Sequence, residues 1–173
     1  MKNGKHSIGP VVSASHLAEG AMPALSEMEF ALTVAGNAFQ RWIIRCMAAA
    51  GAPGLQPTDV LILHAANHRS REKTLADIAV MFNIEDTHIV TYAVKKLQSL
   101  GLVESGRRGK EKTIRVTDEG ERICRRYHEV REALLVSGMK SLAIDEEAMS
   151  QFAALMRLLS GQYDQAARGA VSL

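Results

Sequence analysis

The sequence predicts a mostly α-helical fold that contains one small β-hairpin. Apolar side chains recur at helical spacing on both sides of the centre of the chain. In the centre, from Thr74 to Val116, two short amphipathic helices precede two short strands around a basic loop. With 173 residues, 47% of them hydrophobic, the chain is long enough to bury a sizeable core.

The central segment has its own start and turn signals. Thr74 and Asp77 form a capping box, in which each side chain accepts a hydrogen bond from the other residue's backbone N–H. Asn83, which tolerates a left-handed backbone, ends the first helix, and Asp86 or Thr87 caps the second. Helix, turn, helix and hairpin in this order predict a winged helix-turn-helix, which places its second helix in the DNA major groove.

The second helix has two contrasting faces. Its apolar face is expected to pack on the preceding helix, and it consists of Val90, Ala93, Val94 and Leu97. Its polar face carries hydroxyl, imidazole, phenol and ammonium groups that suit base edges and phosphates, on Thr87, His88, Thr91, Tyr92, Lys95 and Lys96. The same pattern also fits an ordinary solvated helix face.

The predicted hairpin favours nucleic acid. Its loop reads Gly106-Arg107-Arg108-Gly109-Lys110, and both glycines are expected to supply positive φ angles. Three cations at the tip have no core to support, so we expect Arg107, Arg108 and Lys110 to contact phosphates or the minor groove. A nucleotide cradle is a poor alternative, because the GxxxxGK[ST] spacing is absent.

Charge and cysteine content narrow the functional class. Residues 87–116 carry seven basic and two acidic side chains, although the whole chain has a net charge of only +2. This distribution suits a polyanion ligand at the centre of the chain.

The two cysteines, Cys46 and Cys124, have neither zinc-site nor disulfide spacing, which suits a reducing cytoplasm. The sequence has neither an apolar leader nor a membrane span. It offers no catalytic constellation and no cofactor loop, so we expect no enzyme.

Helices flank the central segment. The first is expected to begin at Ser26 in a capping box with Glu29, and it is apolar on two faces, so it needs two partners. Pro57 begins a second helix. After the hairpin, Thr117 caps a long helix that ends at Gly138 and buries Ile123, Cys124, Tyr127, Val130 and Leu134. Asp145 caps a last helix with an apolar stripe of Met149, Phe152, Ala153, Met156 and Leu159.

Four segments follow from this pattern. Residues 1–23 are expected to form an extended arm that lies on its own subunit or on a partner through Ile8, Val11 and Val12. We expect an N-terminal dimerisation helix in 24–55, the winged helix-turn-helix in 56–117, and C-terminal dimerisation helices in 118–173.

From about Ser26 to Arg168 the chain resembles the MarR family of bacterial winged-helix regulators. Three short motifs and their order carry the resemblance: LADIA at 75–79, LQSLGLV at 97–103 and VTDEG at 116–120. The resemblance implies a homodimer on a pseudo-palindromic DNA operator, usually a repressor. It also implies a small aromatic or phenolic effector, or in other relatives an oxidant sensed by cysteine. Two features depart from the family: the wing lacks the usual Asp, and the turn at 83–87 is one residue longer.

Trp42, Arg45 and His64 could line an effector cavity, where an aromatic anion would meet a ring and a cation. The alternative is that Trp42 belongs to the core or to a dimer interface.

His64 and His68 share a helix face, but a metal site would need a third ligand. Cys46 is expected to be too buried to sense oxidants. The alternative function is a winged-helix protein-interaction module that does not bind DNA.

Overall fold

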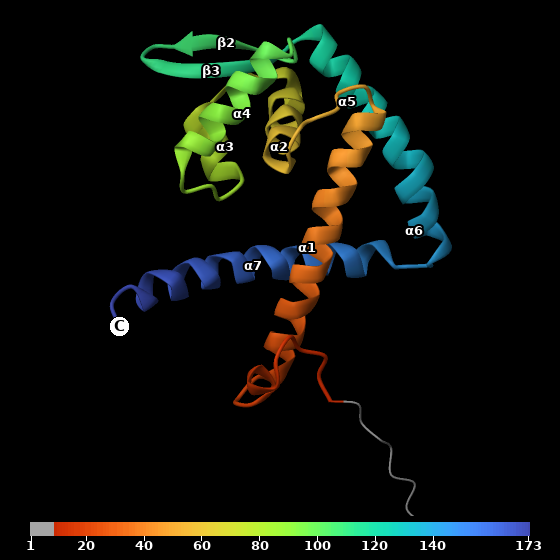
Figure 1. Cartoon of the computed structure of the whole chain (residues 1–173), viewed down its shortest axis with the longest axis vertical. Coiled ribbons are helices and arrows are strands. Elements are labelled where there is room, and N and C mark those ends of the chain that lie inside the picture. The colour runs from red at the N-terminus through yellow and green to blue at the C-terminus, as the bar shows by residue number, and fades with distance from the viewer. Residues whose placement is uncertain (1–8) are drawn as a thin grey trace, which may run out of the picture. The chain divides into compact units, whose positions relative to one another are not determined.

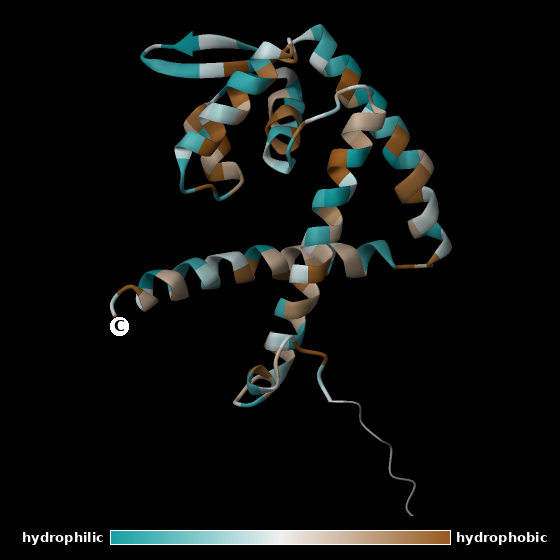
Figure 2. Ribbon diagram, in the orientation of Figure 1, coloured by the Kyte–Doolittle hydropathy of each residue, from teal (hydrophilic) through white to brown (hydrophobic). Residues whose placement is uncertain are grey.

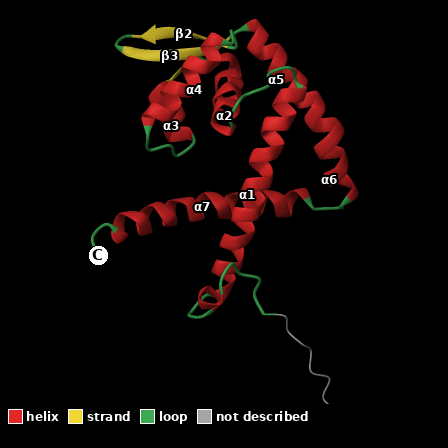
Figure 3. Ribbon diagram, viewed as in Figure 1, coloured by secondary structure: helices red, strands yellow, loops and turns green. Residues whose placement is uncertain are grey.

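The structure, a computed structural model, describes residues 9–173, apart from the side chain of Ser70. Its helices and strands are shown in Figures 1 and 3. In chain order they are η1 (Ser15–Ala18), α1 (Pro23–Ala49), α2 (Pro57–Asn67), η2 (His68–Ser70), β1 (Lys73–Thr74), α3 (Leu75–Met81), α4 (Thr87–Ser99), β2 (Val103–Arg108), β3 (Glu111–Val116), α5 (Asp118–Arg131), η3 (Glu132–Val136), α6 (Ser137–Ser141) and α7 (Glu146–Ala170). The mostly α-helical fold with a small sheet is confirmed.

The chain divides into two compact units, one ending at His128 and the other running from Glu129 to Leu173. The core of the first unit lies where α4 packs on α2 and α3, with the sheet beside them. The most deeply buried side chains there include Ile62, Leu63, Ile78, Val90, Leu97 and Ile114. The expected apolar face of α4 is buried as predicted. This core holds the helix-turn-helix and the wing as one body.

The sheet is antiparallel, with strand order β1-β3-β2. Along β2 and β3 the paired residues run from Val103 opposite Val116 to Arg108 opposite Glu111. Only Gly109 and Lys110 therefore form the turn, with Gly109 at φ +64°. The expected five-residue loop was wrong: Arg107 and Arg108 belong to β2.

Gly106 also differs from the expectation, because it does not adopt a positive φ. It lies in β2 opposite Thr113, and a Cβ on it would sit 2.8 Å from Thr113 Oγ1 and 3.1 Å from Glu72 Oε1. The strand needs glycine at this position for close approach, not for a turn.

Thr117 and Gly120 join the base of the hairpin to α5, the first by hydrogen bonds and the second by close packing. Thr117 Oγ1 accepts from the Gly120 N–H at 3.1 Å, as expected for a cap, and donates to the Gly101 carbonyl at 2.6 Å. A Cβ on Gly120 would lie 2.1 Å from the Leu102 carbonyl oxygen and 2.7 Å from a methyl of Val116. The glycine of the VTDEG motif is thus required by close packing of α5 on the base of the wing.

Helix α1 begins three residues earlier than expected, at Pro23, and Ser26 makes no capping box. Proline is well suited to the first helical position, because its missing N–H has no intrahelical partner there. Only the last turns of α1 are buried, at Ile43, Cys46 and Met47. Upstream, Val34 and Phe39 are exposed.

Of the expected arm, Ile8 lies outside the described residues. Val11 lies against the start of α1, with its N–H 3.4 Å from Glu27 Oε1, and it helps to line a shallow apolar groove on α1 with Phe30 and Val34.

The long helix after the wing does not end at Gly138. It passes through the π-helical turn η3 and α6 to Ser141, because one glycine costs a helix only about 1 kcal/mol. Ala143, at φ 48°, follows its end. Burial of Ile123, Cys124 and Tyr127 is confirmed, whereas Leu134 is 65% exposed and Val130 is half-buried.

In the second unit, Asp145 caps α7 by accepting from the Ala148 N–H at 3.1 Å. The apolar stripe of α7 is present, but none of its residues is buried within the described chain. Phe152 is 56% exposed and Leu158 is 65% exposed. Figure 2 marks hydrophobic residues along the helix. No helix among the described residues is both long and apolar enough to span a bilayer.

Candidate nucleic-acid interface

Helix α4 is held in place by local hydrogen bonds at its start. The Thr74–Asp77 capping box that begins α3 is confirmed, with distances of 2.9 and 3.0 Å. Asn83 has φ 52°, and the Ile84 N–H donates to the Ala79 carbonyl at 2.8 Å. Asp86 then caps α4 by accepting from the His88 N–H at 2.8 Å. These bonds fix the turn of the helix-turn-helix.

The polar face of α4 is exposed at most of the expected positions. Thr87, His88, Tyr92 and Lys95 are all exposed, Tyr92 to 71%. The Lys95 ammonium lies 5.8 Å from the centre of the Tyr92 ring. Thr91 is half-buried, and its hydroxyl donates to the Thr87 carbonyl at 3.0 Å. Its methyl group is therefore better suited to contact than its hydroxyl.

Lys96, an expected phosphate contact, makes contacts within the chain that the sequence did not predict. Its ammonium donates to Asp59 Oδ2 and to the Gly54 carbonyl, both at 2.8 Å. The Asp59 carboxylate is buried, and it also accepts from the Gln56 N–H at 2.7 Å in a capping box at the start of α2. Lys96 thus ties α4 to α2, and its charge is neutralised within the chain.

The cations at the tip of the wing point to two sides. Arg107 is paired with Lys112, and Arg108 with Glu111, so the pleat directs the two arginines to opposite faces of the hairpin. Arg108 forms long, exposed ion pairs with Glu111 at 3.5 Å and Asp77 at 3.7 Å. Arg107, Lys110 and Lys112 are exposed. Lys112 was not among the expected contacts, and only its place opposite Arg107 identifies it.

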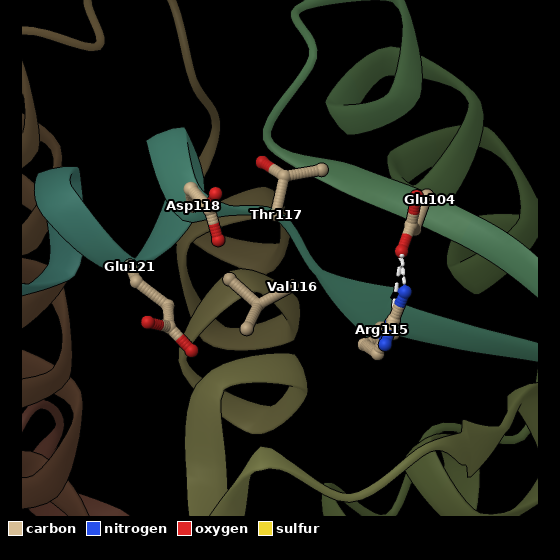
Figure 4. A pocket seen from close by; sticks show the side chains of 6 residues that line it. All are labelled: Glu104, Arg115, Val116, Thr117, Asp118 and Glu121. Atoms are coloured by element: carbon tan, nitrogen blue, oxygen red, sulfur yellow. Dashed lines mark hydrogen bonds and ion pairs between the residues drawn. The ribbon is translucent and has the colours of Figure 1, made fainter.

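The base of the wing has the opposite charge character. A pocket of about 380 Å³ lies there. Figure 4 shows the side chains that line it, those of Glu104, Arg115, Val116, Thr117, Asp118 and Glu121. Arg115 Nε donates to Glu104 at 2.8 Å, and this hydrogen bond with the Glu104 charge raises the pKa of Arg115. Three carboxylates against one paired guanidinium repel a polyanion, so the tip is the part of the wing suited to DNA.

The three residues expected at an effector cavity all lie in the first unit. Trp42 and His64 are half-buried, and Arg45 is exposed. His64 packs edge-on against Tyr127, with ring centres 4.5 Å apart, a contact that the sequence did not reveal. Its Nε2 is buried and has no hydrogen-bond partner among the described residues. Burial lowers the pKa of His64, so its ring is neutral at pH 7.

Both cysteines are buried. The Cys46 thiol donates to the Tyr127 carbonyl at 3.6 Å, and burial raises the pKa of Cys124 to about 11. Neither environment stabilises a thiolate. Among the described residues, no group of three or more His, Cys, Asp or Glu side chains is arranged to hold a metal ion.

Residues 55–120 match the family model "Winged helix DNA-binding domain". No curated protein matches the sequence.

Among solved structures, the chain is similar to a MarR family transcriptional regulator from Rhodococcus sp. RHA1, with 18% identity, a TM-score of 0.64, and coverage of 82% of this chain and 96% of that one. It is also similar to NMB1585, a MarR family regulator from Neisseria meningitidis, with 15% identity, a TM-score of 0.65, and coverage of 83% and 95%. CouR from Rhodococcus jostii RHA1, bound to p-coumaroyl-CoA, has 18% identity, a TM-score of 0.64, and coverage of 76% and 90%.

Proposed function

The chain carries a winged helix DNA-binding domain and has the fold of the MarR family of transcription regulators, and from this premise we propose that it is a sequence-specific transcription regulator acting as a homodimer. The observation that carries the proposal is the pairing of two features in one compact unit. Helix α4 presents an exposed face of Thr, His, Tyr and Lys side chains, and the wing presents unburied cations.

Within this proposal, sequence is read by the outward residues of α4. Thr87, His88, Tyr92 and Lys95 offer donors and acceptors to base edges, and the Thr91 methyl suits a thymine methyl. Arg107, Arg108 and Lys110 supply phosphate or minor-groove contacts at the tip. Lys96 has a structural role in this proposal: its hydrogen bond to Asp59 on α2 holds α4 in its orientation.

The apolar surfaces outside the DNA-binding domain support a homodimer. On α1 and α7 they include Leu32, Val34, Phe39, Phe152, Leu155 and Leu158, each at least 43% exposed. Helices with such faces need a partner. A twofold dimer places two α4 helices on half-sites about one helical turn apart in a pseudo-palindromic operator.

We further propose repression that a small aromatic or phenolic effector relieves. The support is twofold: CouR is a relative in fold with an aromatic acyl-CoA bound, and Trp42, Arg45 and His64 lie in one unit of this chain, with a buried, unpartnered nitrogen on His64.

The test is selection of duplexes from a random library, followed by fluorescence anisotropy at several salt concentrations. We expect one enriched pseudo-palindrome and a Kd that rises steeply with salt. The Arg107→Ala/Arg108→Ala/Lys110→Ala variant should bind more weakly and with a shallower salt slope. Failure of the wild-type protein to bind any duplex at low salt would reject the proposal and favour a protein-interaction module instead.

A further inference from the structure

A second basic surface lies beside the wing, and apart from Arg108 none of its residues has been assigned to DNA so far. It is a pocket of about 280 Å³ where η2, β1 and α3 meet the end of β2. Its cationic lining consists of Arg69, Arg71, Lys73 and Arg108, with His68 at the edge. We call it the wing-side pocket.

Lys73 gives this pocket a fixed positive charge. It is buried, and its ammonium donates to the backbone carbonyls of His68 at 2.7 Å and Arg71 at 3.2 Å. In the part of the chain that the structure describes, no carboxylate lies within 4 Å of that ammonium. Burial, and next the charge of Arg71, lower the pKa of Lys73. The negative charge of an anion in the pocket would favour the charged form of Lys73 and so counteract both effects.

The two acidic groups of the pocket are already engaged. Asp77 accepts from the Thr74 N–H at 2.9 Å within the capping box of α3, and Glu72 accepts from the Thr113 hydroxyl at 3.0 Å. By contrast, Arg69 and Arg71 are exposed, and neither has an ion-pair partner within 4 Å among the described residues. Arg69 stands at φ 61°, an uncommon backbone state for a side chain of this size. The pocket therefore keeps a surplus of unpaired guanidinium groups.

The position of the pocket on the wing indicates what it binds. Arg108 shares a strand face with Gly106, Thr113 and Glu111, whereas Arg107 and Lys112 share the other face with Ile114. The α4 side of the hairpin is the Arg107 face, where Ser105 accepts from Gln98 at 2.5 Å. A wing in the minor groove, which is about 6 Å wide, has a phosphate strand on each side. Arg107 and Lys112 would meet one strand, and the wing-side pocket would meet the other.

We propose that the wing-side pocket is a phosphate site for the DNA strand on the far side of the wing from α4. This inference rests on the proposed DNA-binding function and extends its contact surface to η2 and β1. Arg69 and Arg71 contact the phosphate there, and Lys73 adds a buried positive charge beneath them.

The experiment measures the Kd of the selected duplex against salt for the wild type and for Arg69→Ala/Arg71→Ala. Each lost phosphate contact removes about 0.9 from the slope of log Kobs against log salt, which is about eightfold in affinity at 0.1 M salt. We expect a slope smaller by about 1 to 2 and equal weakening on an unrelated duplex. The matched control is Arg125→Ala/Arg157→Ala, which removes two exposed arginines elsewhere and should leave the slope unchanged.

A second arm places uncharged methylphosphonates one at a time along each strand. Some substitution beside the wing should weaken the wild type but not Arg69→Ala/Arg71→Ala. An unchanged slope in that variant, while the wild type binds DNA normally, would overturn the phosphate site and leave the regulator intact. Saturable binding of inorganic phosphate that this variant loses, together with unchanged DNA affinity, would overturn it too and assign the pocket to a free phosphate compound. No DNA binding by the wild type would instead reject the proposed function.

Discussion

The Lys96 ammonium on α4 lies 2.8 Å from the Asp59 carboxylate at the start of α2. The pair joins residues 37 positions apart in the chain, and only 7% of the Asp59 side chain is exposed. A lysine that the sequence places on a DNA-facing helix is therefore part of the scaffold that orients this helix.

Lys96→Ala should lower the free energy of unfolding by about 1–3 kcal/mol, because the buried Asp59 carboxylate loses its cation. DNA affinity should fall with an unchanged salt slope, since no phosphate contact is lost. Urea unfolding and anisotropy titrations measure the two effects. A slope reduced by about 0.9 would show that Lys96 contacts a phosphate after all. Lys95→Ala is the comparison variant: it removes an exposed cation that the proposal places on DNA, so it should weaken DNA binding without changing the free energy of unfolding.

Gly120→Ala should destabilise the protein by more than about 2 kcal/mol, because the new Cβ would overlap the Leu102 carbonyl at 2.1 Å. Gly161→Ala is the matched control: it too lies in a helix, but its Cβ would meet nothing within 4 Å. That change should stabilise by about 0.5–1 kcal/mol. Equal melting temperatures of the two variants would contradict the close packing of α5 on the wing.

The stability of the first unit should decrease with acid through His64. Its folded pKa lies below the unfolded value of 6.5, because burial disfavours the charged ring. Above pH 6.5 His64 is neutral in both states, and the free energy of unfolding does not depend on it. As the pH falls below 6.5 the unfolded chain binds the proton first, so the free energy of unfolding decreases. Urea unfolding between pH 8 and 5 should show this decline, and His64→Phe should flatten it. An equal decline in the variant would assign the effect to other groups.

Cys124 should be inert to iodoacetamide in the native protein up to about pH 9, since its pKa is about 11. Peroxide should not release DNA, because Cys46 is buried as well. Mass spectrometry of the native and urea-unfolded chain follows the alkylation. Fast native alkylation at pH 7.5 would mean that α5 opens or that the thiol is activated.

Phe152→Glu should shift the protein from dimer to monomer, because it places a charge in the apolar stripe of α7, where Phe152 is 56% exposed in the single chain. Sedimentation equilibrium measures the mass. Gln165→Glu adds the same charge to an exposed polar position of this helix and should leave the dimer intact. A wild type that is monomeric at all concentrations would refute the dimer.

Most local signals could be predicted from the sequence, and long-range ones could not. Two local signals were wrong: Pro23 begins α1 ahead of the expected Ser26–Glu29 box, and Gly138 does not end its helix. The Thr74–Asp77 box, the turn at Asn83 and the cap at Thr117 each depend on residues within four positions of one another, and the structure has all three. The predicted β2 was too short because Gly106 was interpreted as a turn residue. In the structure, glycine is needed there because the side chain of Thr113 lies too close for a Cβ.

The pairing of Lys96 with Asp59 and the meeting of Arg71 with Arg108 were invisible for the same physical reason. Both join segments that are far apart in the sequence and that only the packed core brings together. Neither produces a periodic pattern in the sequence. Among the described residues, α1 before Ile43 and all of α7 have no buried face. A sequence pattern indicates such faces but does not say what covers them.

The two-residue turn at Gly109 and Lys110 has a consequence for how this wing can vary. A strand presents alternate residues to alternate sides, so sliding β2 by one position against β3 would exchange the sides of Arg107 and Arg108. Length changes that keep both arginines in place must therefore add or remove residues in pairs on each strand. A single inserted residue in one strand would leave the same side chains at the tip but exchange the faces of the hairpin on which Arg107 and Arg108 lie.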